Sequence, residues 1–156
     1  ADLAHLGPEP LSDAFTPSWL YEALRQRKRH MKPLLLDQAF LAGLGNIYVD
    51  EALHQAGLHP LTAACRVSKA RAQRLHGVIQ EILEQAIERE GSSFDGFYVT
   101  PEGNPGAYQH QFQVYGRQGQ PCGTCGRALI KILVAQRGTH FCTRCQPAPR
   151  KLPSNR

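Results

Sequence analysis

The chain contains 156 residues, carries a formal net charge of +5 and is 42% hydrophobic. A chain of this length buries about 70% of the surface that its unfolded form exposes, so it can fold without disulfides. No apolar run approaches the roughly 20 residues of a membrane span, and the N-terminus lacks a basic region followed by an apolar core. We therefore expect one or two small domains, and neither a membrane protein nor a secretory precursor.

Charge is distributed unevenly along the chain. Residues 16–34 hold five basic side chains and one acidic side chain, whereas residues 103–156 hold eight basic side chains and no Asp or Glu. Patches of a single sign favour a polyanionic partner. Basic domains also arise for other reasons, so charge alone leaves the partner open.

The first half of the chain predicts helices that follow an extended connector at residues 1–15. Thr16 is expected to cap a helix with Pro17 in its first turn, and this helix runs into the basic residues at 25–29. A second helix is expected to begin at Pro33, because the residue before a proline is disfavoured in the helical conformation.

Two further helices complete the helical part. Glycines at 43 and 45 are expected to end the second helix, and Asn46 is expected to cap a third that runs to a glycine at 57. Ser68 caps a long helix with one apolar stripe, which we expect to end at Gly91. The unit around Asn46 is thus a helix, a two-glycine turn and a helix.

The sequence pattern changes after this long helix, from helical periodicity to loops and short strands. Residues 100–107 are rich in Pro and Gly and predict a loop, and the alternation at 112–114 predicts a short strand. Residues 129–134 predict a second strand, with a turn at Arg137 and Gly138 and a return strand at 139–142. The last ten residues are expected to be disordered. The chain therefore divides into a helical domain of about 95 residues and a small basic β unit.

Four cysteines form two C-x-x-C pairs, Cys122 with Cys125 and Cys142 with Cys145, separated by 16 residues. This spacing is typical of a four-cysteine zinc site. Two disulfides are the alternative, which is less expected because nothing in the sequence marks the chain as secreted. A closed Cys₄ site predicts one structural zinc, which replaces the apolar core that this unit lacks. The fifth cysteine, Cys65, is interpreted as a small buried hydrophobe.

Three residues are candidates for binding a polyanion. Asn46 opens a helix whose first N–H groups can bind phosphate, although it can also be a plain helix cap. Lys32 begins the preceding helix and would place a cation nearby if the helices pack. Arg137 is expected at the tip of the hairpin. The basic run at 25–29 can equally be a solvated face, and the aromatic and amide side chains at 108–115 can equally be packing residues.

No catalytic motif accompanies these candidates. The seven histidines form no H-E-x-x-H pattern, and the sequence contains neither a nucleotide-binding G-x-x-x-x-G-K-[ST] nor a G-x-S-x-G elbow. The residues alone therefore predict a two-part, zinc-containing, nucleic-acid-binding protein.

Several sequence stretches resemble a known family. Residues 6–13 (LGPEPLSD), 31–38 (MKPLLLDQ) and 42–51 (AGLGNIYVDE), with the C-x-x-C pairs around 135–137 (AQR), resemble the bacterial formamidopyrimidine-DNA glycosylases. The similarity extends to about residue 146. The amino-acid sequence at 45–48 (GNIY) looks more like that of these enzymes than like that of their endonuclease VIII relatives. Enzymes of this family remove oxidised purines, such as 8-oxoguanine and formamidopyrimidines, and then nick the abasic strand by β,δ-elimination.

The resemblance implies a mainly α fold: a helix–two-turn–helix domain followed by a small β-hairpin Cys₄ zinc finger. The implied division of the chain is a connector, the helical domain, a lesion-side loop, the zinc finger and a tail, at residues 1–15, 16–95, 96–109, 110–146 and 147–156. The implied partner is double-stranded DNA that contains an oxidised purine or an abasic site. The protein is expected to be a cytoplasmic, nucleoid-associated bacterial monomer that binds no membrane.

The resemblance also assigns roles to residues. It implies that the zinc ligands are the four paired cysteines and that Arg137 is the proton donor in δ-elimination. It further implies phosphate or backbone contacts for a set of six residues, Arg27, Lys32, Asn46, Tyr48, Tyr115 and Arg137. Asn104 stands in the lesion-side loop where some members carry a lysine.

One departure from the family is important. Its chemistry begins at an N-terminal proline amine in a β-sandwich domain, and this sequence begins with Ala1 and Asp2. We therefore expect the chain to be the C-terminal portion of such an enzyme, able to bind DNA and unable to excise a base alone. The alternative hypothesis is a standalone zinc-dependent DNA-binding or regulatory module with no enzymatic activity.

Overall fold

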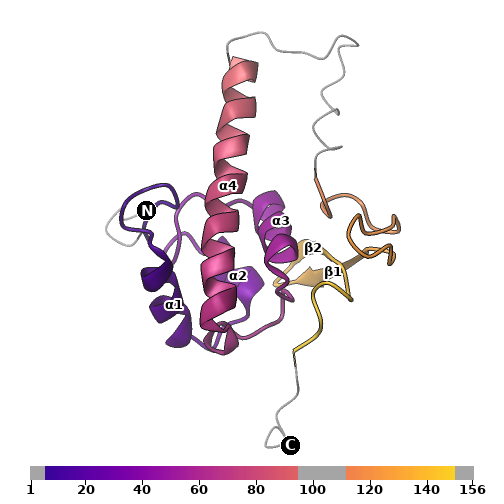
Figure 1. The fold of residues 1–156 in the computed structure, drawn as a ribbon, viewed down its shortest axis with the longest axis horizontal. Helices are drawn as coiled ribbons and strands as arrows, with labels where there is room; N and C mark the ends of the chain where they lie inside the picture. Colours follow the sequence, from indigo (N-terminus) through magenta and orange to yellow (C-terminus); the bar gives the residue numbers. More distant parts are fainter. Residues whose placement is uncertain (1–5, 95–111, 150–156) are drawn as a thin grey trace, which may run out of the picture.

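The structure is a computed structural model that describes residues 6–94 and 112–149 (Figure 1). Within them lie four α-helices, a short 3₁₀ helix and one antiparallel β-hairpin: α1 (Pro17–Arg25), α2 (Met31–Leu36), α3 (Asn46–Ala56), η2 (Ala64–Arg66), α4 (Lys69–Phe94), β1 (Ile130–Val134) and β2 (Arg137–Phe141). The mainly α fold class with a small hairpin and a Cys₄ cluster is confirmed. No helix in these ranges is long and apolar enough to cross a membrane.

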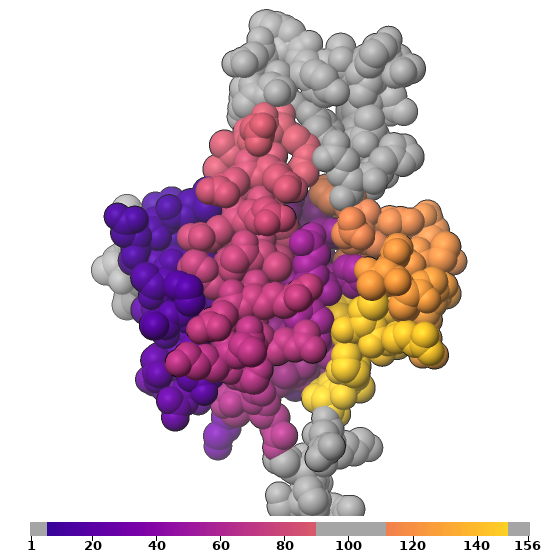
Figure 2. Space-filling model, viewed as in Figure 1, coloured from indigo at the N-terminus to yellow at the C-terminus, as the bar shows by residue number. Residues whose placement is uncertain are grey.

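The helical part is built around α4, against which α1 and α3 pack (Figure 1). Its apolar core draws on every helix, and the fully buried members include Leu24, Leu35, Leu53 and Leu75. Thr16 caps α1, because its hydroxyl accepts the N–H of Trp19 at 3.0 Å. The small unit formed by residues 112–149, hereafter the zinc unit, packs against the side of the helical part (Figure 2).

The expected start of the second helix is wrong. α2 begins at Met31, so Lys32 is helical and Pro33 occupies the third helical position. Proline is tolerated there because the first N–H groups of a helix have no partner within it. The N–H groups of Met31 and Lys32 have no acceptor within the helix. They donate to the carbonyls of Thr62 and Pro60, at 2.8 and 3.0 Å. These two hydrogen bonds to a neighbouring segment therefore outweigh the preference of the residue before a proline for a non-helical conformation.

Other helix ends also differ from expectation. α2 ends at Leu36, several residues before the glycines at 43 and 45 that were expected to end it. Gly45 is the N-cap of α3, and Asn46 is its first helical residue with a side chain that makes no capping bond. α4 continues beyond Gly91 to Phe94, because one glycine lowers helix stability without ending the helix. At the start of α4 the expectation holds, since the Ser68 hydroxyl accepts the N–H of Arg71 at 3.1 Å.

The zinc unit also corrects the sequence interpretation. The segment at 112–114 is a bend and not a strand. The hairpin turn consists of Ala135 and Gln136, both with positive φ, so Arg137 is the first residue of β2 and pairs with Val134. Positive φ at both central residues gives the turn twist that suits a two-residue hairpin.

The burial of Cys65, the lesion-side loop, the tail and the extended connector were also expected. Cys65 is exposed, so its interpretation as a buried hydrophobe is wrong. The lesion-side loop at 96–109, including Asn104, lies outside the described residues, as do residues 150–156 of the tail. Within the connector, the N–H of Gly7 donates to Gln38 O at 2.8 Å, so this stretch is bound to the segment that follows α2.

Candidate zinc centre and nucleic-acid interface

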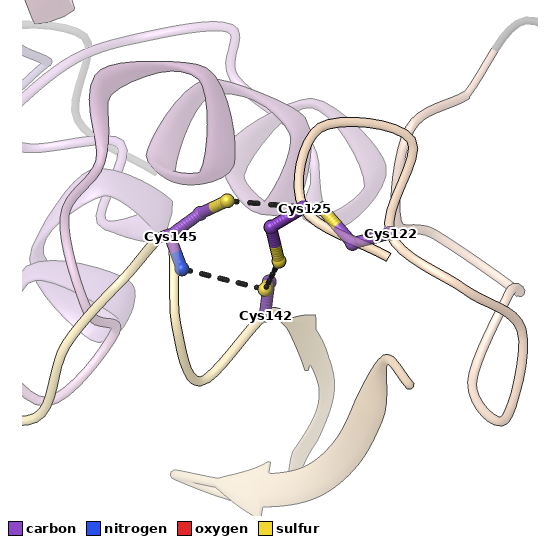
Figure 3. Close-up of side chains that lie close together, drawn as sticks. All are labelled: Cys122, Cys125, Cys142 and Cys145. Carbon is purple, nitrogen blue, oxygen red and sulfur yellow. Dashed lines mark hydrogen bonds between the residues drawn. The ribbon is translucent and has the colours of Figure 1, made fainter. Parts of the chain in front are cut away.

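Four cysteine sulfurs converge at the junction of the hairpin and the preceding turns (Figure 3). All four lie within 4.8 Å of one another. The Sγ atoms of Cys122 and Cys145 are 3.8 Å apart, and those of Cys125 and Cys142 are 3.4 Å apart. Four sulfurs at 2.3 Å from a tetrahedral zinc stand about 3.8 Å from each other, whereas a disulfide needs about 2.05 Å. The cluster therefore fits one structural zinc and not two disulfides.

The protonation of these thiols supports a bound cation. Burial acts to raise the pKa of Cys122, but N–H donors from Cys125, His54 and Thr124 lower it to about 5. Burial and the neighbouring sulfurs raise the pKa of Cys145 to about 12. Four thiolates at this separation repel one another strongly, so a divalent cation is needed to ionise all of them.

The zinc unit has little apolar core of its own. Its buried cluster consists of Val114, Leu129 and two of the cysteines, Cys122 and Cys142. So few side chains cannot offset the entropy of ordering the segment. The metal and the contacts with α3 must therefore hold this unit in place.

One face of α3 supplies those contacts through polar side chains. Asn46, Asp50 and His54 recur every four residues, so they lie on one stripe of the helix, and Glu51 lies beside it. Each of the four side chains hydrogen-bonds to the zinc unit. We call this set the α3 polar stripe.

Glu51 binds the segment that enters the zinc unit. Its carboxylate accepts three consecutive backbone N–H groups, from Gln113, Val114 and Tyr115, at 2.6, 2.9 and 2.9 Å. These N–H groups point to one carboxylate, so they cannot pair alternately with a neighbouring strand. This explains the bend at a place where the alternation of residues predicts a strand.

Asp50 is the centre of a buried network. Lys32, which is fully buried, donates from Nζ to Asp50 Oδ1 at 2.5 Å and to Gly138 O at 3.2 Å. The second carboxylate oxygen of Asp50 accepts the backbone N–H of His140 at 3.0 Å and contacts its Nδ1 at 2.9 Å. Burial lowers the pKa of Lys32, Asp50 opposes that shift, and the charge of Arg137 adds to it.

Asn46 meets Gly138, the residue after Arg137, at the N-terminal end of α3. Nδ2 of Asn46 donates to Gly138 O at 3.2 Å, the same carbonyl that Lys32 contacts. Arg137 immediately precedes this glycine and is exposed. The structure therefore brings Lys32 and Asn46 to one carbonyl of β2, next in sequence to Arg137, with Lys32 buried and Arg137 exposed.

The other predicted DNA-binding residues occupy different positions. The guanidinium of Arg27 lies 4.8 Å from the ring centroid of Phe40 and donates to Ala23 O at 2.7 Å, so it covers the end of α1. Tyr48 is half-buried and packs against the helical core. Tyr115 packs its ring on that of His140 at 4.8 Å, which links it to the Asp50 network.

Sequence reasoning missed the acidic residues of the α3 polar stripe. Asp50 and Glu51 are 1% and 3% exposed, although adjacent acids in a helix are usually solvated. The available signal was their position in a short apolar helix, combined with a C-terminal segment that contains eight basic residues and no acid.

Two family models match the chain. The helix–two-turn–helix domain of formamidopyrimidine-DNA glycosylase matches residues 6–97. A zinc finger found in these glycosylases and in isoleucyl-tRNA synthetase matches residues 119–148. The second match supports the assignment of the cysteine cluster to one structural zinc.

Curated relatives and solved structures agree with these models. A formamidopyrimidine-DNA glycosylase of Symbiobacterium thermophilum is 52% identical over 94% of this chain and 48% of its own length. One of Thermus thermophilus is 47% identical over 92% and 54%. A crystal structure of the Thermus thermophilus protein aligns with a TM-score of 0.81 and 46% identity over 95% of this chain and 56% of that one. A Lactococcus lactis complex with abasic-site DNA aligns at 0.80 and 42%, over 92% and 52%.

Proposed function

Because the chain belongs to the formamidopyrimidine-DNA glycosylase family, we propose that it is the DNA-holding part of a base-excision repair glycosylase. The chain spans about half the length of the curated relatives that it matches. Its proposed partner is duplex DNA that carries an oxidised purine or an abasic site. The Lactococcus lactis relative was solved with abasic-site DNA and with a formamidopyrimidine lesion, which supports this choice over a standalone regulatory module.

The contact that joins Asn46, at the start of α3, to Gly138, the residue after Arg137, carries the proposal. The N-terminus of an eleven-residue helix presents N–H groups that lack a partner within the helix, and a positive dipole end, to a phosphate. Exposed Arg137 beside it supplies a charge-assisted bidentate donor. Together these groups can hold the backbone phosphates on either side of a displaced nucleotide, which is the grip that base flipping needs.

The remaining residues take subordinate roles in this proposal. Lys32 supports the site from below through Gly138 O and does not reach the surface. Tyr48, Tyr115 and Arg27 are proposed backbone contacts on the surrounding surface. In the longer enzyme, Arg137 would also donate the proton in δ-elimination after the sugar has been opened.

Binding to a duplex with a tetrahydrofuran abasic-site analogue tests the phosphate roles. Arg137→Ala should weaken binding and reduce the slope of log K against log salt by about one unit, because one phosphate contact is lost. Asn46→Ala should weaken binding with little change in slope, because the amide carries no charge. Arg89→Ala, which removes the same charge from the second half of α4, is the matched control. Unchanged affinity in both test variants would contradict the proposal.

We further propose that these 156 residues bind DNA without excising a base, and that the protein is monomeric when it does so. The family nucleophile is an N-terminal proline, and Pro8 is the first proline of the chain. Borohydride trapping on 8-oxoguanine DNA should give no covalent adduct, while the same sample shifts that DNA in a binding assay. A trapped adduct would overturn this part of the proposal.

A further inference from the structure

His54 is the residue of the α3 polar stripe that faces the metal site. Its side chain lies in the last turns of α3 and is 6% exposed. Nε2 lies 3.6 Å from Sγ of Cys122, while Nδ1 is buried and has no hydrogen-bond partner among the described residues. The polar contact of this buried ring is thus with a sulfur that binds the metal.

The chemistry of that sulfur decides which nitrogen carries the proton. A cysteine that ligates zinc is a thiolate, which accepts hydrogen bonds and has no proton to donate. Nε2 must therefore carry an N–H, and in the neutral ring Nδ1 is then the bare nitrogen. This tautomer also leaves an acceptor and not a donor unpaired, and buried unpaired donors are the rarer of the two in proteins.

His54 differs from the other donors to the sulfurs. Thr124 N donates to Sγ of Cys122 at 3.4 Å, and Cys145 N donates to Sγ of Cys142 at 3.3 Å. Both are backbone groups of the turns that hold the cysteines. Across residues 6–94 and 112–149, His54 is the side chain of the helical part that donates to one of the four sulfurs.

A zinc ion with four thiolates carries a net charge of −2, so N–H donors to its sulfurs stabilise it. Cys122 is 3% exposed, which leaves water little access to this sulfur if the imidazole is removed. His54 also shares its helix with Asn46, eight residues earlier, and with Asp50 between them. One rigid helix, α3, therefore connects the metal site with the site of Asn46 and Arg137.

We propose that His54 is an outer-shell positioning residue of the zinc site, which holds the Cys122 thiolate through an N–H···S bond and so couples metal occupancy to α3. The proposal rests on the zinc site and is independent of the proposed DNA-binding function. The ring makes no bond to the metal and takes part in no reaction.

The unmodified chain gives the first test. In protein loaded with NMR-active cadmium, a scalar coupling across the hydrogen bond should connect the metal nucleus with the Nε2 proton of His54. Nitrogen shifts of the ring should show a neutral imidazole protonated at Nε2. A neutral ring protonated at Nδ1, with no coupling to cadmium, would overturn the proposal.

Variants give the second test. His54→Phe keeps an aromatic ring and removes the donor, so the zinc dissociation constant should rise about 10- to 100-fold in competition with a chelator. In the cobalt-substituted protein, the sulfur-to-metal charge-transfer bands should move to longer wavelength. His54→Gln places an amide N–H near the position of Nε2 and should restore most of both properties.

His76→Phe is the matched control, because His76 is also buried in a helix and its Nε2 contacts a neighbouring acceptor, here Phe15 O at 2.8 Å. It should lower the free energy of unfolding without changing zinc affinity or the cobalt spectrum. Wild-type zinc affinity and an unshifted cobalt spectrum in His54→Phe would show that His54 serves packing alone.

Discussion

The helical part and the zinc unit are held together by opposite means. The helical part buries a large cluster of Leu, Ile, Val, Met and Phe side chains contributed by all four helices. The core cluster of the zinc unit contains only two aliphatic side chains and two cysteines, and the unit depends on the metal and on the α3 polar stripe. A core that is apolar tolerates small losses, whereas buried charges are stable only while every partner is present.

Because of this difference, we expect the stability of the molecule to be most sensitive to changes in α3. The helix belongs to the apolar core through Val49, Ala52 and Leu53, and to the zinc unit through the α3 polar stripe. Loss of the zinc unit would leave two buried carboxylates and the Lys32 ammonium without part of their partners. We therefore expect the two regions to be coupled thermodynamically although their interiors differ.

Metal removal should have the largest effect. A structural zinc supplies about 10 to 16 kcal/mol to a small zinc-binding fold, so a chelator should unfold residues 112–146. Far-UV circular dichroism should retain the helical signal, and the urea midpoint of the helical part should fall because Asp50 and Glu51 lose partners. Preserved near-native structure in the zinc unit at full metal loss would contradict the Cys₄ assignment.

Replacement of Asp50 should come next. Asp50→Ala leaves the Lys32 ammonium buried without its counter-ion and should cost about 3 to 5 kcal/mol in equilibrium unfolding. The double variant Lys32→Met with Asp50→Ala should recover part of that loss, because no unpaired charge remains. Leu75→Ala, with an expected cost of about 2 to 5 kcal/mol, is the apolar comparison. A cost below about 1 kcal/mol for Asp50→Ala would mean that the network contributes little.

The hairpin turn should give a smaller, stabilising effect. Gln136 has a φ of 67°, which is unfavourable for a residue with a Cβ by about 1 kcal/mol. Gln136→Gly should therefore raise the free energy of unfolding of the zinc-loaded protein by up to about that amount. Lys131→Gly, at a strand position of the same hairpin, should lower it instead. A destabilising Gln136→Gly would show that the side chain makes a contact that outweighs the strain.

Titration of His59 should give the smallest effect. Burial and the nearby His30 lower the pKa of His59 below its ordinary value of 6.5, and its Nδ1 accepts the N–H of Leu61 at 3.0 Å. The unfolded chain binds this proton more readily, so stability is fully present above pH 6.5 and falls as the pH drops towards the folded pKa. His59→Phe should flatten the unfolding free energy in that window. An unchanged pH profile would assign the slope to other groups.

The sequence predicted the elements better than their contacts. Thr16 and Ser68 cap their helices as expected, because capping depends on residues close in sequence. The start of α2 and the bend at 112–114 escaped prediction, because they depend on Pro60, Thr62 and Glu51, which lie elsewhere in the chain.

The candidate site shows the same division. The cysteine spacing was sufficient to predict the metal cluster, since both pairs carry their geometry in short turns. The burial of Lys32 and the His54 contact were not predictable in this way, because they require knowledge of how α2, α3 and the hairpin pack. The sequence predicts the hairpin turn at Arg137 and Gly138, whereas the turn lies two residues earlier and both residues belong to β2.

The coupling of the two regions through α3 is tested most directly by a thermodynamic cycle between Glu51 and zinc. Glu51 accepts hydrogen bonds from three backbone N–H groups of the zinc unit, so its replacement should matter only while that unit is folded. The free energy of unfolding of the wild type and of Glu51→Gln is measured with zinc and after chelation. We predict a loss of several kcal/mol with zinc, on the order of 1 to 3 kcal/mol per weakened charged hydrogen bond, and almost none without it. An equal loss in both states would contradict the coupling.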